Sequence, residues 1–271
     1  MNELENKKLT NAVNILENPG FMIKVSDIVG TPVEKAISLL PIKAQHSIGS
    51  AAQKAIHGAL KLSLKTIRID GQSEDAPPES SNWWHKAAVA TSGAVGGFFG
   101  IAAVAAELPV STTIIMRSIA DVARSEGADL TDVQTQLECV QVLALGGANK
   151  NDDAAEVGYF IAREAMAKAV AEAAAYIAKN GLQKEAAPAI VRLIIQIAER
   201  YSITVTEKAA AQAVPVIGAI GGALINTLFM DHFQDMAKAH FAIRNLELKY
   251  GKDDIKARYI EIRTILRDSR G

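Results

Sequence analysis

The residues that could do chemistry gather in two parts of the chain. The segment MDHFQDMAKAHF holds Asp231, His232 and His240, and Glu107 lies between two apolar segments in AAELPV. A carboxylate that is buried without a partner has a raised pKa, which is the usual mark of an acid that works in catalysis. These four residues are therefore the candidates for a hydrolase or a metal-dependent enzyme.

The spacing of these candidates matches no known catalytic pattern. On one helix Asp231 shares a face with Asp235, whereas His232 lies about 100° around the axis. His232 and His240 are too far apart for the HExxH motif, in which two histidines four residues apart bind zinc. We therefore interpret this stretch as a polar strip on a helix, and Glu107 as a surface carboxylate in a turn.

Other catalytic and cofactor motifs are also missing from the sequence. It contains no GxSxG nucleophile elbow, and no phosphate loop or dinucleotide-binding motif in a strand–helix context. The isolated histidines are better explained as structural residues. The sequence therefore predicts no cofactor and no metal site, and it favours a non-enzymatic protein over an enzyme.

Two long uncharged runs, residues 87–106 and 209–230, dominate the chain. Each reaches the roughly 20 residues that cross a bilayer, but both are rich in alanine and glycine, and Pro215 interrupts the second. Glycines four residues apart clear one face of a helix, so that a neighbouring helix can approach closely. These glycines are Gly93, Gly96, Gly97, Gly100, Gly218 and Gly222. We expect the runs to be central helices of a bundle, with reversible membrane contact and membrane spanning as the alternatives.

The composition predicts an all-α fold. Apolar residues make up 49% of the chain and aromatic residues only 5%, so the apolar share is mostly alanine and aliphatic residues. Alanine has the highest intrinsic helix propensity, and no segment sustains the alternation of a strand. We expect a multi-helix bundle with central Gly/Ala-rich apolar helices and no significant β-sheet.

The acidic, proline-containing segment 70–80 is the clearest loop. It predicts an N-terminal helical segment over 1–69 and a main helical domain over 81–271, with one continuous domain over 1–271 as the alternative. Helices should end at Gly127, Gly181 and Gly251, because glycine readily adopts the left-handed conformation that closes a helix. Glu107-Leu108-Pro109 should break the first apolar run.

Two pairs of side chains have spacings that predict local contacts. Thr131 and Gln134 have the spacing of a capping box, in which both side chains satisfy backbone groups at the start of a helix. Arg117 and Asp121 are one turn apart, which is the spacing of an intrahelical ion pair. We expect both contacts in the folded protein.

Charge and cysteine content exclude some classes of protein. The chain has 29 basic and 30 acidic residues and no basic tract, so no field attracts nucleic acid. Cys139 is the only cysteine, which rules out an internal disulfide, and its apolar surroundings predict a buried, inert thiol. The charged N-terminus lacks the apolar core of a secretory signal, so we expect a cytoplasmic protein.

Three segments resemble the EcsC family of bacterial proteins. They are ENPGFMIKVSDIVGTPVEKAISLLP, ELPVSTTIIMRSIADVARSEG, and VPVIGAIGGALINTLFMDHFQDMAKAHFAIRNLELKYG. The family often has an aspartate where this chain has Glu107, so the charge is kept. The resemblance implies no catalytic residues. The positions that match recurrent family motifs are Asn18, Pro19, Gly20, Phe21, Pro41, Glu107, Pro109, Arg117, Pro215, Gly218 and Arg244.

The resemblance also implies a setting, because the family takes its name from a protein encoded beside an ABC transporter. We expect an accessory or interaction protein in the cytoplasm or on the inner face of the cytoplasmic membrane, with a membrane surface or a transporter as partner. The glycine pairs, with Arg117 and Arg244, would then form a ligand or packing motif. The alternatives are a helical protein that binds a lipid or another apolar ligand, and the enzyme considered above.

Overall fold

The computed structural model describes residues 1–17, 21–29, 37–38, 40–66, 99–145, 158–181, 187–213 and 222–269. Within these ranges the chain forms nine α-helices and no strand, which confirms the predicted all-α bundle. The loop predicted at 70–80 lies outside the described residues, so the proposed domain division stays a prediction. The helices are α1 (Glu3–Leu16), α2 (Phe21–Val29), α4 (Ile42–Thr66), α6 (Phe99–Ser125), α7 (Val133–Leu145), α8 (Gly158–Asn180), α9 (Pro188–Ala213), α11 (Gly222–Tyr250) and α12 (Lys252–Asp268).

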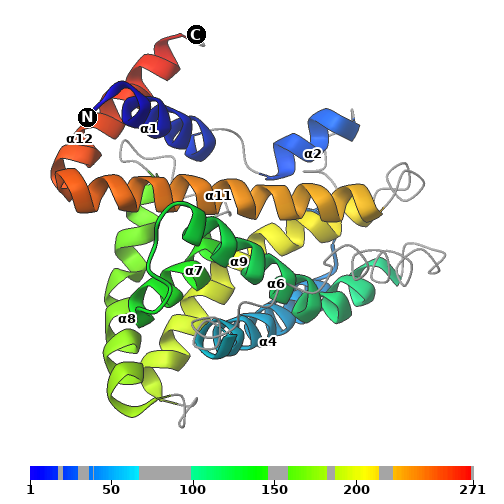
Figure 1. Ribbon diagram of the computed structural model, residues 1–271. Coiled ribbons are helices and arrows are strands. Elements are labelled where there is room, and N and C mark those ends of the chain that lie inside the picture. Colours follow the sequence, from blue (N-terminus) through cyan, green and yellow to red (C-terminus); the bar gives the residue numbers. More distant parts are fainter. Residues whose placement is uncertain are drawn as a thin grey trace, which may run out of the picture.

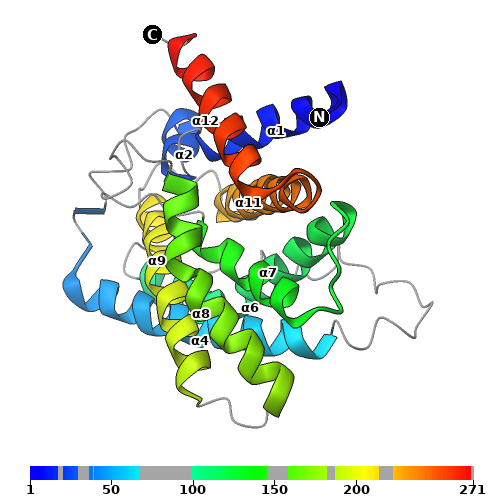
Figure 2. The same ribbon diagram turned by 90° about the vertical axis from the view of Figure 1, so that its left-hand side faces the viewer.

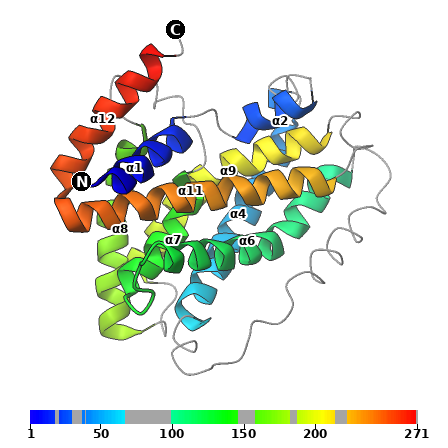
Figure 3. The same ribbon diagram turned by 45° about the horizontal axis from the view of Figure 1, so that its top comes forward.

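Helix α11 runs across the middle of the molecule and divides it into two layers. Helices α1 and α12 lie on one side of it, and α4, α6, α7 and α9 lie on the other (Figure 1, Figure 2, Figure 3). Helices α8 and α9 follow one another as an antiparallel pair along the flank of the larger layer. Side chains on α11 therefore face both layers and can connect them.

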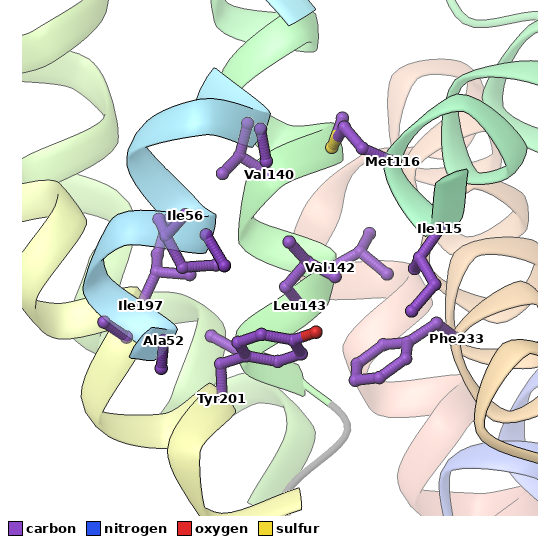
Figure 4. Packing of buried hydrophobic residues seen from close by; sticks show 14 of the residues in the cluster. Ala52, Ile56, Ile115, Met116, Val140, Val142, Leu143, Ile197, Tyr201 and Phe233 are labelled. Atoms are coloured by element: carbon purple, nitrogen blue, oxygen red, sulfur yellow. The ribbon is translucent and has the colours of Figure 1, made fainter. Parts of the chain in front are cut away.

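The main hydrophobic core fills the larger layer. Figure 4 shows its centre, where Ala52 and Ile56 of α4 pack with Ile197 and Tyr201 of α9. Helix α7 lies deepest, because every residue from Gln136 to Ala144 is buried. A helix that is apolar on nearly all sides must be surrounded by other helices, and α7 meets this condition.

A smaller core joins the termini to α8 and α11. It contains Leu9 and Val13 of α1, and Tyr259 of α12, which stacks on Tyr159 of α8 with 6.2 Å between ring centroids. Glu17, at the end of α1, completes this contact. It accepts hydrogen bonds from the Tyr259 hydroxyl at 3.0 Å and from Nε of Arg263 at 2.8 Å. The two ends of the chain thus hold each other against α11.

The glycines predicted to close helices do so. Gly127, Gly181 and Gly251 have φ angles of 85°, 65° and 95°, in the left-handed region that other residues rarely adopt. Gly251 separates α11 from α12, so it sets the angle at which the smaller layer turns back. The glycine pairs of the two uncharged runs lie outside the described residues, except Gly100 and Gly222 in the first turns of α6 and α11.

Three local predictions are wrong. Pro109 lies inside α6 rather than ending a helix, because Leu108 and Ile115 bury that face in the core and packing outweighs one lost hydrogen bond. Asp121 pairs with Arg124 at 3.3 Å, whereas Arg117 makes no ion pair with any described residue.

The third correction concerns the start of α7. Thr131 does not cap this helix, because its backbone and hydroxyl both bond to Asp129. Asp132 takes that role, since its carboxylate accepts a 2.9 Å hydrogen bond from the backbone N–H of Thr135.

We predict that Asp132→Ala lowers the free energy of unfolding by about 1 kcal/mol, the usual effect of losing an N-cap. The substitution leaves the N–H of Thr135 without its partner at the start of the most buried helix. Urea unfolding followed by circular dichroism measures the change. Thr131→Ala is the matched control and should cost only a few tenths of a kcal/mol. A larger effect for Thr131→Ala than for Asp132→Ala would restore the capping box.

Candidate functional site

Polar side chains of α11 form a stripe that faces α7 and α8. His240, Arg244 and Glu247 follow one another at intervals of four and three residues, which places them on one helical face. Opposite them lie Glu138 of α7, and Tyr159 and Arg163 of α8. We call these six residues the polar network: Glu138, Tyr159, Arg163, His240, Arg244 and Glu247.

Two arginines and two glutamates of the polar network compensate each other. Arg244 binds Glu138 in bidentate fashion, through Nε at 3.1 Å and Nη2 at 3.0 Å, and its Nη1 reaches Glu247 at 3.2 Å. Arg163 binds the other oxygen of Glu247 at 2.5 Å. The Glu247 side chain is only 1% exposed, so both of its oxygens depend on these guanidinium groups.

The hydrogen bonds also fix the proton positions on Tyr159 and His240. Nη1 of Arg163 donates to the Tyr159 oxygen at 3.0 Å, and Arg163 has no acceptor. The tyrosine proton must therefore go to Nδ1 of His240, which lies 3.0 Å away. His240 then carries its own proton on Nε2, and this buried atom has no hydrogen-bond partner in the part of the chain that the structure describes.

Burial keeps both rings neutral. Burial, helped by the charges of Arg163 and Arg244, lowers the pKa of His240 well below its usual value. Burial likewise raises the pKa of Tyr159 to about 12, although the neighbouring Arg163 opposes this shift. Near neutral pH neither ring gains or loses its charge, so the pair acts as a fixed hydrogen-bond unit.

Two adjoining clefts open above the polar network. The inner cleft has a volume of about 80 Å³ and lies between α7, α8 and α11. The outer cleft has a volume of about 220 Å³ and is closed on one side by the first turn of α12. Both are lined by Arg163, Ala167 and Lys252. The outer cleft is completed by Phe160, Glu164, Glu247, Asp253 and Lys256.

Glu107 belongs to a second polar cluster, in the larger layer. It pairs with Lys208 of α9 at 3.1 Å, and the Lys208 side chain is only 1% exposed. The ammonium group also lies 4.8 Å from the ring centroid of Phe229. Burial lowers the pKa of Lys208, while Glu107 opposes this shift. The predicted surface turn at Glu107 is therefore wrong, because the residue lies within α6 and its partly buried carboxylate is paired.

The residue before Lys208 is a buried carboxylate of another kind. Glu207 makes no ion pair with any residue in the described ranges, and burial raises its pKa to about 7. Such a group destabilises the folded state once it is ionised. The end of α9 thus carries one compensated charge and one uncompensated charge.

The four catalytic candidates do not line either cleft. Asp231 is exposed, and His232 is buried against Phe21 and Phe233, with 6.0 Å and 5.2 Å between ring centroids. His240 belongs to the polar network and Glu107 to the cluster with Lys208. No group of three His, Cys, Asp or Glu residues in the described part of the chain is placed to hold a metal ion.

Half of the residues of the polar network are not predicted from the sequence. The spacing of His240 and Arg244 was visible, but Glu138, Tyr159 and Arg163 lie on other helices and form no local motif. The sequence offers one sign of these partners, a charged residue inside an apolar helix. This residue is Glu138 in LECVQVLAL, and its burial predicts a partner of opposite charge. Its neighbour Cys139 is buried, and burial raises the pKa of its thiol, which agrees with the predicted inert cysteine.

We predict that Glu247→Gln lowers the free energy of unfolding by about 3 kcal/mol, because both guanidinium groups lose their shared counter-charge in a buried site. Guanidinium chloride unfolding measures the loss. Glu261→Gln removes one partner of an exposed pair with Arg258 and should cost less than about 1 kcal/mol. Equal losses for the two variants would show that the polar network is not stabilising.

A second prediction concerns pH. The folded-state pKa of Glu207 is about 7, compared with an ordinary value of 4.5, so the penalty begins above pH 4.5 and is complete above pH 7. Glu207→Gln should therefore raise the free energy of unfolding by up to about 3 kcal/mol at pH 8 and change it little at pH 4.5. Thermal unfolding at both pH values tests this, with the exposed Glu199→Gln on the same helix as control. A gain that does not vary with pH would contradict the assignment.

Comparison with protein families gives a match. A model of the EcsC protein family matches residues 17–246, most of the chain, including Glu138, Arg163 and Arg244 of the polar network. Curated proteins and solved structures give no match. Among the described residues, no helix combines the length and the apolar character that crossing a membrane requires.

Proposed function

The chain belongs to the EcsC protein family, and from this premise we propose that it is a non-enzymatic interaction protein that works at the cytoplasmic face of a membrane. The observation that carries the proposal is the closed polar network beneath the two clefts. Its arginines hold its carboxylates, and its histidine and tyrosine are neutral and bonded to each other. Charges held in fixed positions suit recognition of a ligand or partner better than proton transfer.

The surface where α1 meets the end of α11 supports a role in contacts. Helix α1 crosses the end of α11, where Glu5 binds Lys249. The residues next to this pair, Leu4 and Leu248, are 66% and 82% exposed. Exposed leucines next to charged residues resemble a contact surface, in which apolar anchors are surrounded by polar groups.

The family association supplies the proposed partner. We infer that the exposed end of α11 meets a membrane protein, such as an ABC transporter, or the membrane surface itself. A peripheral contact of this kind needs no spanning helix, because apolar anchors and lysines together bind an interface.

Membrane fractionation and liposome flotation at low salt test the proposal. We expect part of the wild-type protein to accompany membranes, and the double variant Leu4→Ser/Leu248→Ser to lose this fraction. Ile42→Ser is the matched control, since Ile42 is an equally exposed apolar residue on α4. The role at the membrane face is wrong if all wild-type protein stays in the soluble fraction and binds no liposomes.

A further inference from the structure

The outer cleft carries equal numbers of positive and negative side chains. Arg163, Lys252 and Lys256 line it together with Glu164, Glu247 and Asp253. Both oxygens of Glu247 are taken by arginines, so a lone anion in this cleft would meet the carboxylates of Glu164 and Asp253. A lone cation would meet three cationic groups. The charge distribution therefore disfavours a ligand with only one sign of charge.

The cationic side of the cleft has unused hydrogen-bond donors. The bonds of Arg163 to Tyr159 and Glu247 use two of its five N–H groups, and its guanidinium lies 5.1 Å from the ring centroid of Phe160. These contacts hold the planar fork in place before any ligand arrives, and such a fork suits an anionic group with two oxygens. Lys252, beside it, makes no ion pair with the described residues.

The anionic side of the cleft is open to solvent. The Glu164 side chain is 63% exposed, and among the described residues it pairs with Lys256 alone, at 3.2 Å. Asp253 is exposed in the first turn of α12 and makes no ion pair within the described ranges. An exposed pair contributes little stability, so a ligand ammonium can replace Lys256 beside Glu164 at small cost.

We propose that the outer cleft binds a small zwitterion, with its carboxylate or phosphate on Arg163 and Lys252 and its ammonium between Glu164 and Asp253. The cleft has a volume of about 220 Å³, and one water molecule takes about 30 Å³. The cleft therefore holds a small zwitterion that occupies the space of several water molecules. The same chemistry is offered by a free amino acid and by an ethanolamine phospholipid headgroup. The inference rests on the proposed interaction role and names the ligand class of its cleft.

Isothermal titration of the full chain tests the proposal with L-alanine and phosphoethanolamine as probes. Propionate, inorganic phosphate and ethylamine are the probes with one sign of charge. Ala167→Leu fills the cleft without changing any charge, since Ala167 is exposed and lines both clefts. Ala165→Leu is the matched control, because Ala165 is exposed on the same helix and lines neither cleft. Both variants keep a strong helix former.

We expect a zwitterionic probe to bind at least tenfold more tightly than the singly charged probes, and Ala167→Leu alone to weaken this binding tenfold or more. If neither soluble zwitterion binds, flotation with vesicles that contain phosphatidylethanolamine decides. If the vesicles retain the wild-type protein and Ala165→Leu but not Ala167→Leu, the zwitterion is the headgroup of an ethanolamine phospholipid.

Other outcomes overturn the proposal that the outer cleft binds a zwitterion. Equal affinity for propionate or phosphate would show a simple anion site, and equal effects of the two leucine variants would place binding outside the cleft. The absence of binding in both the titration and the vesicle arm also overturns it. Membrane association that persists in that case, and that depends on Leu4 and Leu248, would leave the interaction role in place and remove only the ligand class.

Discussion

The bidentate contact of Arg244 with Glu138 is the interaction on which the rest of the structure depends. It joins α11 to the most buried helix of the molecule, and the same guanidinium then reaches Glu247, which holds Arg163 of α8. Helix α11 is thereby held to α7 and α8, which lie next to each other in the sequence but far from α11. Buried charges are costly unless all are compensated, so the loss of any one of these side chains leaves another without its counter-charge. The clefts border on this network, because Arg163 lines both of them, and Glu138 and Arg244 line the inner one.

The two buried polar clusters have different consequences for the protein. The polar network borders on solvent through the clefts, so part of its hydrogen-bonding capacity stays accessible. The Glu107–Lys208 pair is enclosed by helices α6, α9 and α11, where the ring of Phe229 covers the ammonium group. The polar network can therefore contact a ligand, whereas the Glu107–Lys208 pair fixes the relative position of α6 and α9.

Much of the fold could be predicted from the sequence, because it depends on local properties. Alanine content predicts helices, and Gly127, Gly181 and Gly251 close them by their own conformational preference. The errors arose where tertiary packing outweighs local preference, as it does at Pro109. The candidate site was harder to predict. His240 and Arg244 share a helical face in the sequence, but their partners on α7 and α8 come together only through folding, and no local spacing reveals them.

The contact between the two ends of the chain has a consequence for biosynthesis. Glu17 is translated 242 residues before Tyr259 and 246 residues before Arg263, the two side chains that bind it. Until α12 has left the ribosome, the apolar face of α1 around Leu9 and Val13 lacks part of its cover. The nascent chain therefore leaves this apolar face partly uncovered while the residues between α1 and α12 are made, and apolar surface exposed in this way favours aggregation.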